Sequence, residues 1–80
     1  MLYLSEVDVK CKDAVYRVAV DTHPYYASQF VRNAMRVILP FKNFRILSMR
    51  RATYQEIDGM QSIDSCYHAW YSYAPNRRLK

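Results

Sequence analysis

A single helical pattern lies in the middle of this chain, between segments with the alternation typical of strands. In THPYYASQFVRNAMRVILP, residues 22–40, apolar residues recur at three- and four-residue steps. This apolar set is Ala27, Phe30, Val31, Ala34, Val37 and Ile38. The spacing places the set on one face of a helix, which we expect to pack on a core. Thr22 is suited to cap the helix, Pro24 to its first turn and Pro40 to its end.

Strand patterns flank this helix on both sides. Residues 2–11 and 14–22 surround Lys12-Asp13 and predict a β-hairpin, in which alternate residues share a face. One face of the first strand holds Tyr3, Ser5, Val7, Val9 and Cys11, and one face of the second holds Tyr16, Val18 and Val20. Residues 43–57 predict a third, long strand. Asp58-Gly59 predicts a tight turn, because glycine supplies the positive φ that such a turn needs. Residues 60–74 then predict a last strand, with a bulge or wider loop in the region 62–65.

The predicted fold is therefore α+β: a small single domain, residues 1–80, of order ββαββ. We expect a four-stranded, mainly antiparallel sheet with one helix packed on one face and a basic C-terminal tail at about residues 75–80. One helix covers only one face of a sheet, so the other face is expected to meet water or a partner. On the last strand Tyr67, Tyr71 and Tyr73 point to one side and Trp70 to the other.

Charge is segregated along the chain, with a net value of +5. Residues 22–54 contain no acidic residue, whereas residues 55–65 are acidic and the tail is basic. Most of the cations are arginines, which bind phosphates and carboxylates through two parallel hydrogen bonds and stack on flat rings. This pattern is compatible with a solvated basic face and with a surface that binds an anionic partner.

Catalytic and metal-binding patterns are absent from the sequence. With one glycine the chain has no phosphate loop and no nucleophile-elbow motif. His23 is interpreted as a capping or surface residue and His68 as a half-buried residue in mid-strand. Cys11, His23, Cys66 and His68 form a formal Cys2His2 set, but their spacing matches no familiar zinc motif. We therefore expect free thiols, no metal, no cofactor and no enzymatic activity.

The location predicted from the sequence is the cytoplasm. No run of about 18 apolar residues is present, so we expect no membrane-spanning segment. The N-terminus has no charged region followed by a long apolar region, so it does not resemble a signal peptide.

These observations predict a non-catalytic binding protein whose partner is nucleic acid or a nucleic-acid-handling protein. Arginines would supply phosphate contacts and tyrosines would stack on unpaired bases. The predicted binding surface consists of Arg32, Arg36, Arg45, Arg50, Arg51, Tyr67, Tyr71, Tyr73, Arg77 and Arg78. Trp70 is the alternative stacking residue. The glycine-and-aromatic signature of the RNA-recognition fold is missing.

The alternative is a small inhibitor or adaptor that occludes a binding site on a partner protein. Tyr, Trp and Arg are also the residues enriched in protein–protein hot spots. Small single domains of this character are common among phage-encoded inhibitors, for example anti-CRISPR proteins. A homodimer is compatible with either alternative.

Overall fold

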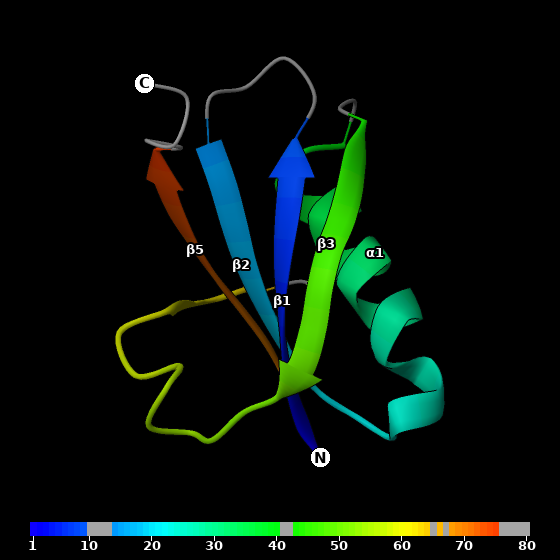
Figure 1. Ribbon diagram of the computed structural model, residues 1–80, viewed down its shortest axis with the longest axis vertical. Coiled ribbons are helices and arrows are strands. Elements are labelled where there is room, and N and C mark those ends of the chain that lie inside the picture. Colours follow the sequence, from blue (N-terminus) through cyan, green and yellow to red (C-terminus); the bar gives the residue numbers. More distant parts are fainter. Residues whose placement is uncertain (10–13, 41–42, 65, 67, 76–80) are drawn as a thin grey trace.

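One helix packs against an antiparallel sheet in the computed structural model, which describes residues 1–9, 14–40, 43–64, 66 and 68–75. The described residues form five strands in the order β3-β1-β2-β5-β4 (Figure 1). The predicted α+β class, single helix and antiparallel sheet are confirmed. The predicted four-stranded ββαββ arrangement is not, because the region after the helix is organised differently.

Strands β1 (Leu2–Val9) and β2 (Ala14–Asp21) form the predicted antiparallel hairpin at the centre of the sheet. Their register places Ser5 opposite Val18 and Val7 opposite Tyr16, so the described members of the two predicted sets lie on the same face of the sheet. The Lys12-Asp13 turn and Cys11 lie outside the described residues.

Strand β1 is buried on both of its faces. Val7 and Val9 belong to a core that faces the helix. Leu2 and Leu4 are also buried, in a second cluster on the opposite face. The two faces of the sheet therefore each require a cover of apolar side chains.

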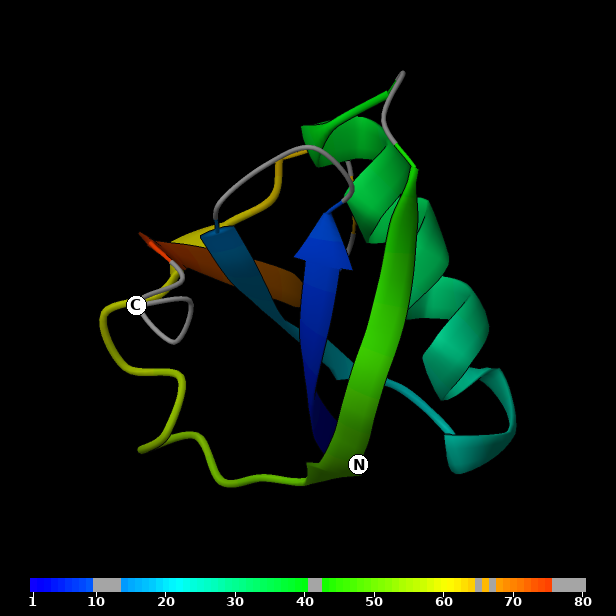
Figure 2. The ribbon, with the colours of Figure 1, turned by 45° about the horizontal axis from the view of Figure 1, so that its top comes forward.

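Helix α1 (Ala27–Ile38) covers the first face and follows a short 3-10 turn, η1 (Pro24–Tyr26). The His23 ring nitrogen Nδ1 accepts a hydrogen bond of 3.1 Å from the backbone N–H of Tyr25, so His23 caps the turn in place of the predicted Thr22. In both ribbon views α1 lies beside the sheet rather than across its whole width (Figures 1 and 2), and the strand that it packs against most closely is β2.

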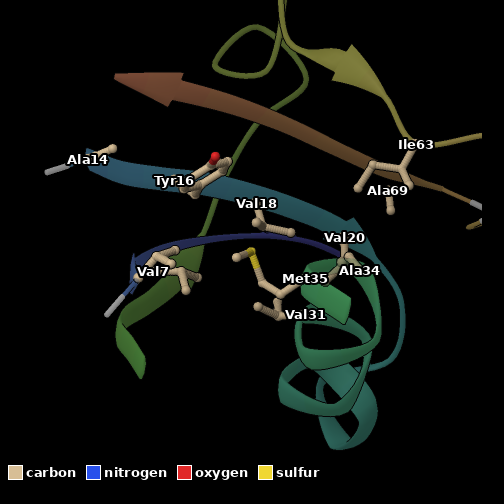
Figure 3. Packing of buried hydrophobic residues seen from close by; sticks show 11 residues of the cluster. Val7, Ala14, Tyr16, Val18, Val20, Val31, Ala34, Met35, Ile63 and Ala69 are labelled. Carbon is tan, nitrogen blue, oxygen red and sulfur yellow. The ribbon is translucent and has the colours of Figure 1, made fainter. Parts of the chain in front are cut away.

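The buried face of α1 differs from the predicted stripe at three positions. Ala27, Val31 and Ala34 are buried and Ile38 is partly buried, as predicted. Met35 is fully buried although it was not predicted, and in Figure 3 it lies with Val31 beneath Val18. Phe30 and Val37 are instead 38% and 45% exposed. The helix faces the sheet a fraction of a turn away from the centre of the apolar pattern, which moves these two side chains to its flank.

Strand β3 (Phe44–Arg51) is shorter than the predicted third strand and pairs with β1, not with the last strand. The chain turns after Ala52 because the Glu56 carboxylate accepts the Thr53 N–H at 2.9 Å, while the Glu56 N–H bonds to the Thr53 carbonyl. A threonine followed three residues later by glutamate is a known helix-start signature. This local signal overrides the apolar alternation on which the long strand was predicted.

The predicted Asp58-Gly59 turn is present, with Gly59 at a φ of 90°. It does not join two strands that pair with each other, as the predicted third and last strands would. It leads from the 52–60 segment into β4 (Gln61–Ser62), which pairs with β5 (Ala69–Pro75). The described residues between β4 and β5, which are 63, 64, 66 and 68, are not part of a strand. His68 lies in this connection with a φ of 55°, exposed rather than half-buried in mid-strand.

The 52–60 segment covers the second face of the sheet. It runs from the end of β3 to the opposite edge of the sheet (Figure 1). Ile57 is buried with Leu2, Leu4 and Ala19, and Met60 packs against this cluster. The face predicted to meet water or a partner is therefore partly covered by the chain itself.

Strand β3 contains a β-bulge opposite Glu6 and Val7. Glu6 pairs with Ser48 and Val7 with Ile46, which leaves Leu47 as the extra residue. A bulge bends the strand and increases its local twist.

The burial of Met35 can be tested by comparing two alanine variants on the same helix. Met35→Ala is expected to reduce the free energy of unfolding by about 2–5 kcal/mol, because it leaves a cavity against Val18. Val37→Ala should change it by less than about 0.5 kcal/mol, because the side chain is largely exposed. Urea denaturation of both variants measures the difference. A larger loss for Val37→Ala than for Met35→Ala would mean that α1 packs through the stripe predicted from the sequence.

A second test concerns Ser5, whose hydroxyl is buried without a hydrogen-bond partner among the described residues. An unsatisfied buried polar group costs about 1–3 kcal/mol. Ser5→Ala is therefore expected to increase the free energy of unfolding by about 1 kcal/mol, measured by urea denaturation. A loss of similar size would show that this hydroxyl makes a stabilising bond in solution.

Candidate functional site

The described members of the predicted binding surface lie on three different surfaces. Arg32 and Arg36 project from the outer side of α1. Arg45 and Arg50 pair with Asp8 and Leu4 and lie on the sheet face opposite the helix. The last group, on the helix side of the sheet, consists of Arg51, Tyr71 and Tyr73. Tyr67, Arg77 and Arg78 lie outside the described residues.

The net positive charge of the chain is not carried by the described part of the fold. Half of the twelve basic residues lie outside it, namely Lys10, Lys12, Lys42, Arg77, Arg78 and Lys80, against Asp13 alone of the seven acidic residues. The described region therefore contains equal numbers of arginine and carboxylate side chains. An electrostatic argument about this region must depend on where each charge lies and whether it is paired.

Several arginines are engaged within the protein. Arg50 forms an ion pair of 2.6 Å with Glu56, which lowers the pKa of that carboxyl below its ordinary value mainly through the hydrogen bond. The Arg51 guanidinium lies 5.9 Å from the centre of the Tyr3 ring. Arg50 and Arg51, both predicted to contact phosphate, therefore point to opposite faces and have different neighbours.

Trp70 is occupied by the cover of the second face. It packs against the Leu2–Leu4 cluster, and the Tyr54 ring meets it edge-on at 6.1 Å. Neither sheet face thus presents Trp70 as a free stacking platform.

Asp21 connects this cover to the N-terminus. Its carboxylate accepts a short hydrogen bond from the Tyr54 hydroxyl and a bond of 3.1 Å from the N-terminal ammonium group of Met1. The Tyr54 bond, followed by that of the N-terminus, lowers the pKa of Asp21. The same bond raises the pKa of Tyr54. These contacts hold the 52–60 segment over the sheet.

Exposed aromatic rings gather where η1 leads into α1. Tyr25 is 80% exposed, and its ring meets that of Tyr26 edge-on at 5.0 Å. Tyr26 in turn lies 6.4 Å from Phe30. No ion pair joins Arg32 or Arg36 to any carboxylate of the described residues. We call Tyr25, Tyr26, Phe30, Arg32 and Arg36 the α1 outer face.

The α1 outer face was only partly predicted from the sequence. Its arginines were identified, but Phe30 was assigned to the core and the two tyrosines were not selected. The signal that was available is the His-Pro start: a cap at His23 places Tyr25 and Tyr26 before the first turn of α1, where nothing from the sheet covers them.

A tyrosine groove of about 560 Å³ lies on the helix side of the sheet, beyond the end of α1. Its lining is Tyr16, Tyr71, Ser72 and Tyr73 from β2 and β5, Ile38 and Leu39 from the end of α1, and Gly59 and Gln61 from the chain around β4. The rings of Tyr16 and Tyr73 lie 5.1 Å apart at 57°. Figure 3 shows the Tyr16 hydroxyl directed toward β5 and away from α1.

The three tyrosine hydroxyls of this groove have no hydrogen-bond partner among the described residues. Burial raises the pKa of Tyr16, and the nearby Tyr73 and Tyr71 hydroxyls raise it further. The Tyr16 hydroxyl therefore remains a protonated donor at neutral pH.

The residues considered for metal binding do not assemble in the described structure. Cys11 lies outside the described residues, Cys66 is a free thiol, and the His23 side chain caps η1. Within the described ranges, no group of three or more His, Cys, Asp or Glu residues could hold a metal ion.

No helix formed by the described residues is long and apolar enough to cross a bilayer. Comparison with known proteins found no matching family model, no matching curated protein and no matching solved structure.

The Asp21 contacts generate a pH prediction. A carboxyl whose pKa is lowered in the folded state stabilises the fold above its unfolded pKa of about 3.9, and this contribution is lost as the pH falls through the lower folded value. Asp21→Asn should therefore lower Tm at pH 7, and its difference from the wild type should shrink between about pH 5 and pH 2. Thermal unfolding at several pH values measures this.

Tyr54→Phe is the matched control, because it keeps the ring against Trp70 and removes only the hydroxyl. The difference in Tm between wild type and Tyr54→Phe should also shrink as the pH falls, but by less than the difference for Asp21→Asn. Parallel Tm curves for wild type and both variants would contradict the proposed role of Asp21.

Proposed function

We propose that this protein is a non-catalytic binding protein that engages a nucleic-acid-handling protein, or nucleic acid itself, through the α1 outer face. The observation that carries the proposal is that exposed rings, and arginines without an ion pair among the described residues, both lie on this helix and the turn that precedes it. Tyrosine and arginine dominate binding hot spots, because a rigid ring and a guanidinium both give large contact area with directional bonds.

The surface chemistry favours an acidic partner. Between residues 22 and 54 the sequence contains no acidic residue, so the α1 outer face has no carboxylate of its own helix beside its arginines. Arg32 and Arg36 are one helical turn apart and repel each other slightly, which stabilises nothing within the fold. An acidic patch on a partner would relieve this repulsion.

Between the two partner classes, the geometry supports a protein more than nucleic acid. Each phosphate neutralised contributes about −0.7 to −0.9 to the slope of log K against log salt. Two arginines would give a slope of about −1.4 to −1.8, or roughly a tenfold loss of affinity between 50 and 200 mM salt. Known nucleic-acid binders that use six to ten phosphate contacts lose far more. Strong nucleic-acid binding would require the cations outside the described residues.

An inhibitor or adaptor that covers a site on a nucleic-acid-handling protein is the form of this function that we favour. Two features support this form: the domain is small, and residue types enriched in hot spots are concentrated on one helix. In addition, Trp70 packs within the fold and is not free to stack on bases. Among the described residues, no group of His, Cys, Asp and Glu side chains could hold a catalytic metal ion.

The proposal predicts a specific ranking of arginine variants. The double variant Arg32→Gln/Arg36→Gln should abolish capture of the partner in a pull-down from lysate, and nuclease treatment should not release the partner from the wild type. Arg50→Gln removes one positive charge that Glu56 already neutralises, so it should leave capture unchanged.

Titration of the protein with labelled single-stranded and duplex oligonucleotides at 50 and 200 mM salt separates the two partner classes. Weak binding with a slope no steeper than about −1.8, lost in the double variant, agrees with the proposal. Tight binding with a much steeper slope that survives the double variant, together with release of the partner by nuclease, would contradict it.

A further inference from the structure

Strand β3 forms one edge of the sheet, and within the described ranges no other strand pairs with its outer side (Figure 1). The strand has eight residues, and the bulge at Leu47 separates its first part from residues 48–51. Unpaired backbone groups along a strand edge are a template for an additional strand. The regular stretch after the bulge is the part of this edge that offers such a template.

The direction of the backbone groups in this stretch follows from one hydrogen bond. The Ala52 N–H donates to the Leu2 carbonyl at 3.0 Å, directly opposite in the register of β1 with β3. Bonded and non-bonded pairs alternate along an antiparallel ladder, so Ala52 and Arg50 bond to β1. Met49 and Arg51 instead direct their backbone N–H and C=O groups away from β1. The Arg51 carbonyl accepts a bond of 3.2 Å from the Arg50 guanidinium, as expected for a carbonyl that faces outward.

Two side chains of this stretch lie on the helix side of the sheet. Met49 is partly buried against the helix-side core, and the exposed Arg51 lies two residues further along the same face. The Arg51 guanidinium lies over the Tyr3 ring and forms no ion pair with a carboxylate of the described residues. An added strand would therefore meet one apolar and one cationic side chain at alternate positions on this face.

The strands and the helix place no acidic side chain on the helix side, as far as the structure describes them. β3 and α1 lie within residues 22–54, which contain no acidic residue. The acidic residues of β1 and β2, which are Glu6, Asp8 and Asp21, lie on the opposite face. Opposite charges on neighbouring strands stabilise their pairing. A carboxylate on an added strand would thus approach Arg51 without a competing acid.

We propose that residues 48–51 of β3 bind an acidic extended segment of a partner protein by strand addition. Backbone bonds to Met49 and Arg51 would supply affinity, and the alternate side chains of the added strand would supply selectivity. The selected pattern is an acidic residue two positions from an apolar one, because these meet Arg51 and Met49 on the same face. This edge is separate from the α1 outer face, so the inference does not depend on the function proposed for that helix.

The test uses a fluorescein-labelled peptide with blocked ends and the sequence Thr-Glu-Thr-Val-Thr-Glu-Thr. A glutamate lies two residues from the valine in both directions, so the peptide suits parallel and antiparallel addition equally. Titration into the full chain at 50 mM salt, followed by fluorescence anisotropy, should give saturable binding that weakens at 500 mM salt. A peptide with lysine in place of both glutamates should bind about tenfold more weakly or less.

Two N-methylated peptides separate strand addition from simple charge attraction. One is methylated at its valine and both glutamates, and the other at its last three threonines. Neighbouring amides of a strand point to opposite edges, so only one of the two sets faces β3. One peptide should therefore lose binding while the other retains it, and the peptide that loses binding identifies the direction of the added strand.

Amide hydrogen exchange locates the added strand on the protein. Exchange at Met49 and Arg51 should slow when the peptide is added, because both amides then donate to the peptide. Exchange at Arg50, whose amide bonds to β1, should change little.

Arg51→Gln should weaken binding of the peptide about two- to fivefold, the value of one exposed charge pair. Arg17→Gln is the matched control, because Arg17 is an exposed arginine on the opposite face of the sheet, and it should leave the Kd unchanged. Both side chains are exposed, so the variants should fold, and circular dichroism checks this.

Three results would overturn the inference. The first is the absence of binding at 50 mM salt, or an equal effect of the two sets of N-methyl groups. The second is binding that Arg32→Gln/Arg36→Gln abolishes while the Met49 and Arg51 amides stay unprotected, which would place the peptide on the α1 outer face. The third is a dimeric mass of the free chain with both amides already protected, which would make a second copy the occupant of this edge.

Discussion

The fold depends on a central strand that is apolar on both sides. Val7 and Val9 require a cover on one face of β1, and Leu2 and Leu4 require one on the other. A chain of 80 residues with one helix can supply only one conventional layer. The second cover is an irregular segment, and its few buried side chains are supplemented by the contacts of Tyr54 with Trp70 and Asp21. Both the position of β3 and the path of the chain after it follow from this requirement.

Periodicity in the sequence predicted those features that depend on one face of a single strand or helix. Alternation of apolar residues predicts the β1–β2 hairpin and the residues that share a face of each strand. Three- and four-residue spacing predicts the extent of α1. The burial of Met35 and the exposure of Phe30 and Val37 could not be predicted from the helix alone. The packing of the helix on the sheet determines which part of an apolar stripe is buried. Strand order was missed for a related reason: Gly59 forms a turn, but a turn does not specify which strand the chain joins next.

The candidate sites show the same division. Sequence composition identified arginine and tyrosine as the residues of interest, and it selected Arg32, Arg36, Tyr71 and Tyr73. It could not separate an arginine paired with a carboxylate from one that is unpaired, because Arg50 and Glu56 meet only after the chain turns at Thr53. Nor could it place Tyr16 beside Tyr73, since their proximity depends on the pairing of β2 with β5. Aromatic residues that are equivalent in the sequence pattern therefore have different environments in the fold.

The bulge at Leu47 has a consequence for self-association. No strand of the described residues pairs with the outer edge of β3, and open edges of this kind are templates for intermolecular sheet growth. The extra residue interrupts the regular spacing of backbone groups along that edge. If two copies met there in antiparallel order, Arg45 of one would approach Arg50 and Arg51 of the other, and like charges oppose such pairing. The bulge at Leu47 and the arginines of β3 therefore both oppose aggregation through the outer edge of this strand.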